Sequence, residues 1–153
     1  MKNDKKLSVW EKYLTREIGI EFKACLYFFA ILFFYCIYRM FCGEFSASIL
    51  HMAEMILACY LIGYAQVYLL WNFDEAEKLG KREWFGMVLC TALYGTAAHF
   101  CKWFDGKILM SAALSGYILI TYICVFFIYK SKRKIDDKKL NEELRLFQTR
   151  HKK

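Results

Sequence analysis

The sequence contains no proline, and this absence excludes proline kinks from every helix that the chain forms. None of the seven cysteines belongs to a CxxC pair, which excludes the usual signature of a membrane thiol oxidoreductase or a zinc finger. The chain also lacks a phosphate-binding glycine loop, a recognisable nucleophile with its base, and a pair of catalytic carboxylates. We therefore expect a protein that is not an enzyme and that carries neither a cofactor nor a metal.

Apolar residues are abundant instead. Hydrophobic residues make up 58% of the 153 residues and aromatic residues 19%, which is more than one water-soluble core of this size buries. Because about 20 apolar residues cross a bilayer core, the four long apolar runs predict transmembrane spans. The expected fold class is all-α, an integral membrane four-helix bundle with spans at about 24–42, 50–73, 84–103 and 108–129.

Lysine and arginine are distributed unevenly over the segments between these spans. With four spans, the two termini and the loop after the second span share one side, which holds 19 of the 22 Lys and Arg residues. The positive-inside rule then places both termini in the cytoplasm of a multi-pass cell-membrane protein. Because the net charge of +7 then lies at the anionic inner leaflet, we expect lipid, and not nucleic acid, as the partner of the basic flanks.

The segments outside the spans form two further units. Residues 1–23 contain a capping-box pattern, Ser8 with Glu11, followed by apolar residues on one helical face. This pattern indicates either a short interfacial helix with its aromatic residues at headgroup depth or a polar lead-in to the first span. The basic tail, 130–153, is expected to continue the fourth span as a helix into the cytoplasm.

The inner loop and the tail form a hypothetical docking surface. The loop sequence NFDEAEKLGKREW mixes both signs of charge, and it is either a solvated connection or a surface for a cytoplasmic partner. The tail has an imperfect apolar stripe that is too short to establish a coiled coil, and it packs on a partner, on a dimer mate or on the inner loop. The hypothetical docking residues are Asp74, Glu75, Lys81, Arg82, Leu140, Leu144 and Phe147.

Small residues recur at four-residue spacing on the third and fourth spans. Such spacing places them on one helical face and lets transmembrane helices approach closely. We therefore expect these two spans to pack against one another. The residues concerned are Thr91, Gly95 and His99 on the third span, and Ser111, Ser115, Ala112 and Gly116 on the fourth.

Ionisable side chains lie in the outer halves of the spans. At about 1.5 Å per helical residue, Arg39 and Glu54 lie at matched depths below the first outer turn, and His51 lies one turn shallower than Glu54. We expect Arg39 and Glu54 to form a structural ion pair. The complete outer polar layer consists of Arg39, His51, Glu54, His99 and Lys102.

Several functions remain open for this layer beside a purely structural one. A histidine beside a carboxylate changes charge near physiological pH, which suits a signal or ligand pocket open to the outside. Alternatives are a metal site from His51, Glu54 and His99, a bis-histidine haem on the two histidines, and a transport carboxylate at Glu54. Cys42 and Cys101 both lie near the outer surface, and their pairing also remains open.

Four spans, the charged inner loop and the tail sequence YKSKRKIDDKKLNEELR resemble a group of small four-span membrane proteins of unknown function from Gram-positive bacteria. Their genes often lie beside those of LytTR-type transcriptional regulators. The resemblance extends from about Cys25 to Arg145 and is one of architecture and tail pattern. It carries over no catalytic motif, and this chain differs in its extended amino-terminal segment and in its Cys- and aromatic-rich spans. The resemblance implies a regulatory or accessory protein that holds a cytoplasmic regulator or a transporter component at the membrane.

The sequence thus predicts an accessory or regulatory membrane protein that binds a cytoplasmic or membrane partner, or its own second copy. In this hypothesis the outer polar layer receives a signal, and the inner loop and tail provide the output. The alternative is a small oligomeric transporter or channel subunit.

Overall fold

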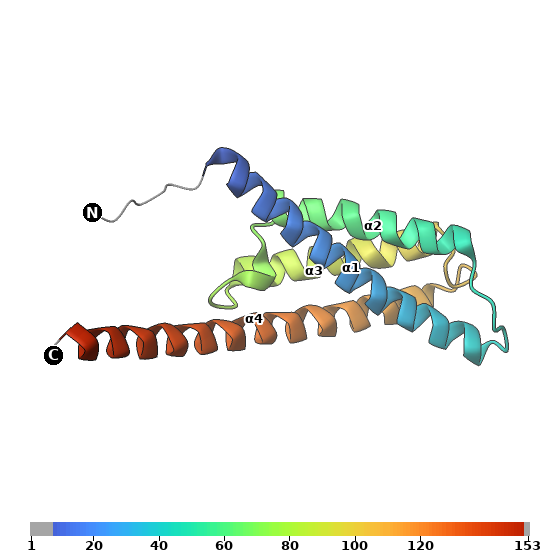
Figure 1. The fold of residues 1–153 in the computed structure, drawn as a ribbon. Helices are drawn as coiled ribbons and strands as arrows, with labels where there is room; N and C mark the ends of the chain where they lie inside the picture. Colours follow the sequence, from blue (N-terminus) through green and yellow to red (C-terminus); the bar gives the residue numbers. More distant parts are fainter. Residues whose placement is uncertain (1–7, 152–153) are drawn as a thin grey trace.

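The computed structural model describes residues 8–151, and this part of the chain is all-helical (Figure 1). Four α-helices share one core, with a short 3₁₀ helix between the second and the third. No strand occurs within residues 8–151. The elements are α1 (Val9–Phe41), α2 (Ile49–Tyr68), η1 (Phe73–Glu75), α3 (Lys81–Phe100) and α4 (Ile108–His151).

Helix α1 begins at the predicted capping box. The Ser8 hydroxyl accepts a hydrogen bond from the Glu11 backbone N–H at 3.2 Å, and the Glu11 carboxylate accepts one from the Ser8 N–H at 2.7 Å. From there the helix runs without interruption to Phe41. The expectation of a separate short helix at 1–23 is therefore wrong for the described residues, because no residue between Val9 and Phe41 breaks the backbone hydrogen-bond ladder.

The two faces of α1 show that the helical body is built for an apolar surrounding. Three tyrosines and Lys23 are buried on its inner face, whereas phenylalanines dominate its exposed face. In a water-soluble protein we would expect the opposite arrangement, with the phenylalanines buried and the lysine exposed, because burial of the more apolar side chains is favourable in water. The buried tyrosines are Tyr27, Tyr35 and Tyr38, and the exposed phenylalanines are Phe22, Phe29, Phe33 and Phe41.

Three of the helices, α1, α2 and α4, are long and apolar enough to cross a membrane. Helix α3 is not among them, because its first turn carries Lys81, Arg82 and Glu83 and its remainder is rich in small and polar residues. Its inner face nevertheless packs in the common core through Met87 and Tyr94.

Helix α2 ends at Tyr68, five residues before the predicted end of the second span. Trp71 and Asn72 both adopt left-handed backbone conformations, with φ of 57° and 52°, which an α-helix does not tolerate. The chain then turns inward at η1, and Phe73 enters the core beneath Gly86. A Cβ atom at Gly86 would lie 2.6 Å from the Phe73 ring, so the glycine makes room for it.

Helices α3 and α4 approach closely at Gly95, as the small-residue spacing predicts. A Cβ atom at Gly95 would collide with Oγ of Ser115. That hydroxyl donates to the Ser111 carbonyl at 3.2 Å, which turns it along its own helix. Gly116 has open space around it, so of the second predicted small-residue pair only Ala112 lies beside α3, where it lines a groove between the two helices.

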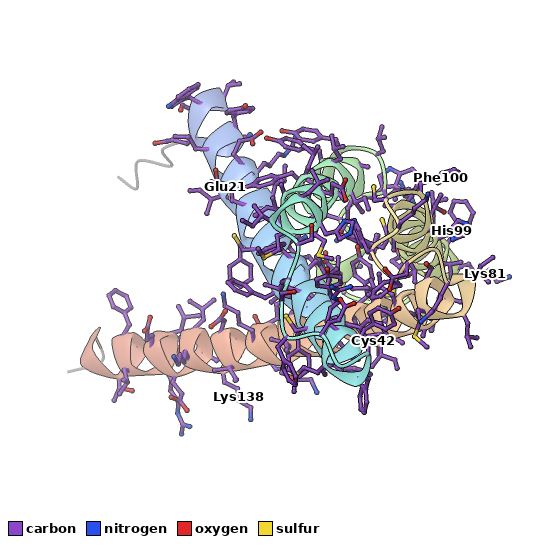
Figure 2. The ribbon with its side chains drawn as sticks, turned by 90° about the vertical axis from the view of Figure 1, so that its right-hand side faces the viewer. Glu21, Cys42, Lys81, His99, Phe100 and Lys138 are labelled. Atoms are coloured by element: carbon purple, nitrogen blue, oxygen red, sulfur yellow. The ribbon has the colours of Figure 1, made fainter. Side chains whose placement is uncertain are left out.

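Helix α4 extends far beyond the rest of the fold. Residues 130–151, which we call the α4 arm, continue the helix as predicted and project away from the other helices (Figures 1 and 2). Leu140 and Leu144 on this arm are 57% and 50% exposed. The arm therefore keeps an apolar surface that nothing in the described chain covers at these two residues.

Candidate functional site

The end of the fold from which the α4 arm projects, which we call the inner end, holds a buried ammonium group. Lys23 Nζ donates to Oδ1 of Asp74 at 2.7 Å, lies 3.0 Å from Oε1 of Glu75, and also donates to Oδ1 of Asn72. An ammonium group has three N–H donors, so the loop after α2 supplies one acceptor for each. The left-handed backbone at Asn72 is what brings three loop residues to the same atom.

This ion cluster is connected to the α4 arm. Arg133 donates through its guanidinium to the carbonyls of Glu75 and Ala76 at 2.8 and 2.7 Å. Lys23 thus contacts the carboxylates of Asp74 and Glu75, whereas Arg133 binds backbone carbonyls of the same loop. We call these four residues with Asn72 the inner clamp. It joins α1, the η1 loop and the first turns of the arm.

Sequence reasoning missed the inner clamp. The distribution of lysine and arginine places Lys23 only among the basic residues that flank the first span, and the mixed charges of the inner loop place Asp74 on the hypothetical docking surface. Asp74 is in fact buried, so its assignment to a docking surface is wrong. The missed signal is a pair of opposite charges next to two apolar runs, Lys23 before the first run and Asp74 directly after the second.

The opposite end of the fold, which we call the outer end, holds a second polar cluster, formed by His51, Glu54 and Trp103. One carboxylate oxygen of Glu54, Oε2, lies 3.0 Å from Nδ1 of His51 and accepts a hydrogen bond from Nε1 of Trp103 at 3.1 Å. The Ser48 hydroxyl caps α2 just above it by accepting from the His51 N–H at 3.4 Å. The Tyr35 ring lies edge-on to the imidazole, with ring centroids 6.1 Å apart. We call His51, Glu54 and Trp103 the outer triad.

The predicted ion pair between Arg39 and Glu54 does not form. Arg39 instead pairs with Glu44, which lies in the turn after α1 and is closer along the chain. Glu54 is satisfied by His51 and by Trp103, a residue that depth matching of charges did not consider. Matched depth is therefore an insufficient criterion, because it does not tell which face of each helix a side chain occupies.

The remaining two members of the predicted layer lie elsewhere. His99 lines a groove between α3 and α4, on the side of α3 turned away from α1 (Figure 2). Lys102 is exposed in the following turn, in a left-handed conformation with φ of 53°. The structure thus brings together His51 and Glu54 but separates Arg39, His99 and Lys102 from them.

This separation bears on the metal and haem alternatives. Within the described residues no group of three His, Cys, Asp or Glu side chains is placed to hold a metal ion, so the set His51, Glu54 and His99 is not assembled. The two histidines face different surroundings, which removes the geometric basis for a bis-histidine haem. All seven cysteines are free, so Cys42 and Cys101 are not paired.

The other predicted docking residues are accessible. Lys81 and Arg82 are exposed at the start of α3, and the guanidinium carbon of Arg82 lies 3.4 Å from the centre of the Trp71 ring. Glu75 is partly exposed while it contacts Lys23. Leu140, Leu144 and Phe147 are exposed on the α4 arm.

Comparison with known proteins identifies no relative: no protein-family model, curated protein or solved structure matches this chain.

Proposed function

We propose that the chain is a four-span regulatory or accessory protein of the cell membrane, with both termini in the cytoplasm, that holds a cytoplasmic partner on its α4 arm. The observation that carries this proposal is the exposed arm itself, a helical extension with Leu140 and Leu144 accessible to a partner. The apolar side chains of the arm are not buried by the rest of the chain, so the arm would gain stability by packing them against a partner. An apolar stripe on such a helix therefore favours a binding role.

The inner clamp supports a regulatory rather than a purely anchoring role. Because Arg133 binds the loop that encloses Lys23, the direction of the arm depends on the position of α1. The outer triad contacts the same helix through Tyr35. One continuous helix, α1, thus connects the outer triad, where a signal is received in this proposal, with the inner clamp that holds the arm.

Membrane placement of α3 is part of the proposal. Its outward face carries Phe85, Val88 and Leu93, all exposed, and its inner face packs with three helices that are apolar enough to span. If the outward face of α3 faced water instead of lipid, these apolar side chains would be exposed to water. The uneven distribution of lysine and arginine then favours cytoplasmic termini, in keeping with the resemblance to four-span proteins encoded beside LytTR-type regulators.

A direct test uses the arm in the full-length protein in membranes. The unchanged chain should cross-link to a partner in cells. The double variant Leu140→Asp with Leu144→Asp should no longer cross-link to that partner. Leu146→Asp is the matched control, because it places the same charge on another face of the arm. A partner retained by the double variant, or lost equally with the control, would contradict docking on this stripe. A reporter fused after Lys153 should read cytoplasmic.

A small oligomeric transporter or channel subunit is the second candidate, favoured by polar atoms in the core. Among the described residues, the Tyr35 and Tyr94 hydroxyls and Nε2 of Gln66 are buried without a hydrogen-bond partner. Such groups are costly in lipid unless water or a solute visits them. Reconstituted protein that conducts ions or solutes into liposomes, with loss of flux in Glu54→Gln, would favour this candidate over the regulator.

A further inference from the structure

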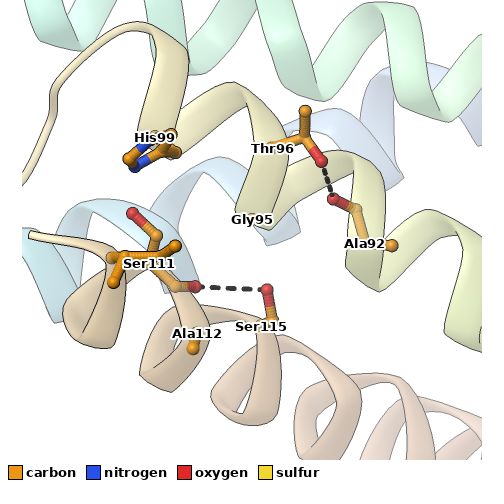
Figure 3. Close-up of a pocket in the computed structure, with 8 residues that line it drawn as sticks. Ala92, Gly95, Thr96, His99, Ser111, Ala112 and Ser115 are labelled. Atoms are coloured by element: carbon orange, nitrogen blue, oxygen red, sulfur yellow. Dashed lines mark hydrogen bonds between the residues drawn. The ribbon is translucent and has the colours of Figure 1, made fainter. Parts of the chain in front are cut away.

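The groove between α3 and α4 is separate from both polar clusters. It has a volume of about 310 Å³, at the lower end of the roughly 300–1,000 Å³ of small-molecule sites. His99, Ile108 and Ser111 line the end near the turn between the two helices, and Ala92, Gly95 and Ala112 line the remainder. The groove therefore has a polar end and an apolar end built from small residues (Figure 3).

Ser111 is the residue that points to a ligand. It is only 4% exposed, it lines the groove, and its hydroxyl makes no hydrogen bond to any described residue. The other two hydroxyls of the groove are occupied, since Thr96 donates to the Ala92 carbonyl at 2.7 Å and Ser115 to the Ser111 carbonyl at 3.2 Å. The Ser111 hydroxyl thus opens onto the groove without a protein partner, and a bound acceptor would satisfy it.

His99 faces Ser111 from the opposite wall. Figure 3 shows the imidazole on α3 and the Ser111 hydroxyl on α4 turned toward one another, with no hydrogen bond joining them. Each has a donor to offer to a group placed between them. The two side chains form the polar head site of the groove.

The charges around the head site favour an anion. Lys102 lies in the turn that follows α3 and is exposed. Lys107 of the same turn is directed away from the groove, with its Nζ 5.4 Å from the centre of the Tyr38 ring on α1. The carboxylate in the same turn, Asp105, accepts a hydrogen bond from the Tyr38 hydroxyl at 2.8 Å, which draws it toward α1. Two donors, His99 and Ser111, and the exposed Lys102 three residues after His99 therefore favour an anionic acceptor at the head site.

We propose that this groove binds the head of an anionic amphiphile, a carboxylate or a phosphate between His99 and Ser111, with the first part of its chain over Gly95 and Ala112. The proposal rests on the membrane placement argued above, because an amphiphile reaches the groove from the bilayer. It does not rest on docking at the α4 arm.

The test uses the full chain in neutral detergent with a photoreactive palmitate as the probe. Cross-links should map to residues 92–115. Unlabelled palmitate should compete about tenfold better than hexadecanol, which has the same chain and no charge, since a charged hydrogen bond at the head site is lost. A single-chain lysophosphatidate distinguishes phosphate from carboxylate. Equal competition by hexadecanol, or cross-links spread over all helices, would overturn the proposal.

Variants separate the groove from the general apolar surface. Ala112→Leu fills the groove and should reduce cross-linking about tenfold, whereas Ala113→Leu, on an exposed neighbour outside the groove, should leave it unchanged. Ser111→Ala should weaken palmitate about tenfold and hexadecanol little. If the two leucine variants behave alike, or if Ser111→Ala retains full affinity, the proposal is wrong. Variants of Leu140 and Leu144 should not alter cross-linking, so failure of arm docking and failure of the groove are distinguishable.

Discussion

Lys23 Nζ lies 2.7 Å from Oδ1 of Asp74, and the two side chains are 2% and 0% exposed. The lysine belongs to α1 and the aspartate to η1, so the pair closes the inner end of the fold across two elements. Buried opposite charges of this kind do not necessarily add net stability, but the removal of one partner leaves the other uncompensated. The pair is therefore better described as a constraint on the loop than as a source of stability.

The first prediction concerns this pair. Lys23→Met should lower the free energy of unfolding by about 3–5 kcal/mol, because Asp74 is left charged and buried. The double variant Lys23→Met with Asp74→Leu should recover much of that loss. The measurement is thermal or denaturant unfolding in detergent. Lys81→Met, at an exposed lysine near the same end, is the control and should change stability little. Equal effects of Lys23→Met and Lys81→Met would show that the pair does not form.

A second prediction concerns the connection between loop and arm. Arg133→Ala removes the donor for the Glu75 and Ala76 carbonyls, so hydrogen exchange should accelerate in residues 73–79 and in the first turns of the arm. Lys134→Ala, one residue further and exposed, should leave exchange in the loop unchanged. Exchange measured by mass spectrometry on the intact protein in detergent reports both regions. An unaltered loop in Arg133→Ala would mean that the arm is not clamped to it.

Trp103 provides a third prediction. Its indole is buried and donates to Glu54 at 3.1 Å, so Trp103→Phe removes a charge-assisted hydrogen bond and leaves a small cavity. A loss of about 2–3 kcal/mol in unfolding free energy is expected. Trp84→Phe is the matched control at a partly exposed tryptophan and should cost well under 1 kcal/mol. The fluorescence spectrum should also change more in Trp103→Phe, because Trp103 is the more buried indole.

The fourth prediction tests the close contact of α3 and α4. Gly95→Ala should destabilise the protein by about 1–3 kcal/mol, since the new methyl group collides with the Ser115 hydroxyl. Ser115→Ala in the same chain removes the colliding oxygen and should restore most of the stability. Gly116→Ala meets open space and should be neutral or slightly stabilising. Similar destabilisation by both glycine variants would contradict the packing described for Gly95.

Much of the fold could be predicted from the sequence. Helical class, approximate helix positions, the Ser8 cap and the close approach at Gly95 follow from local patterns that depend on a few neighbouring residues. The end of α2 could not be predicted, because the left-handed turn at Trp71 and Asn72 occurs without glycine and is held by contacts from Lys23 and Arg82. Those contacts come from segments remote in the chain, and no local pattern encodes them.

The candidate site was predicted only in part. His51 and Glu54 meet because they lie one turn apart on one helix, a relationship that is visible in the sequence. Their contact with Trp103, and the diversion of Arg39 to Glu44, depend on how α1, α2 and the turn after α3 are rotated about their axes. Depth along a helix can be counted, but rotation is set by packing of the whole core.

Three properties of this protein follow from its residues alone: it is helical, its helices carry more apolar surface than a water-soluble core of this size buries, and its positive charges lie mainly on one side of the predicted spans. These properties are sums over residues and need no knowledge of contacts. Which polar groups meet depends instead on how the helices pack. This packing placed Lys23 inside a loop that looked like a solvated connection, and it turned His99 toward Ser111 instead of His51. The physical reason is that a buried charge or donor is stable only beside a complementary group, and the packing of the helices decides which group that is.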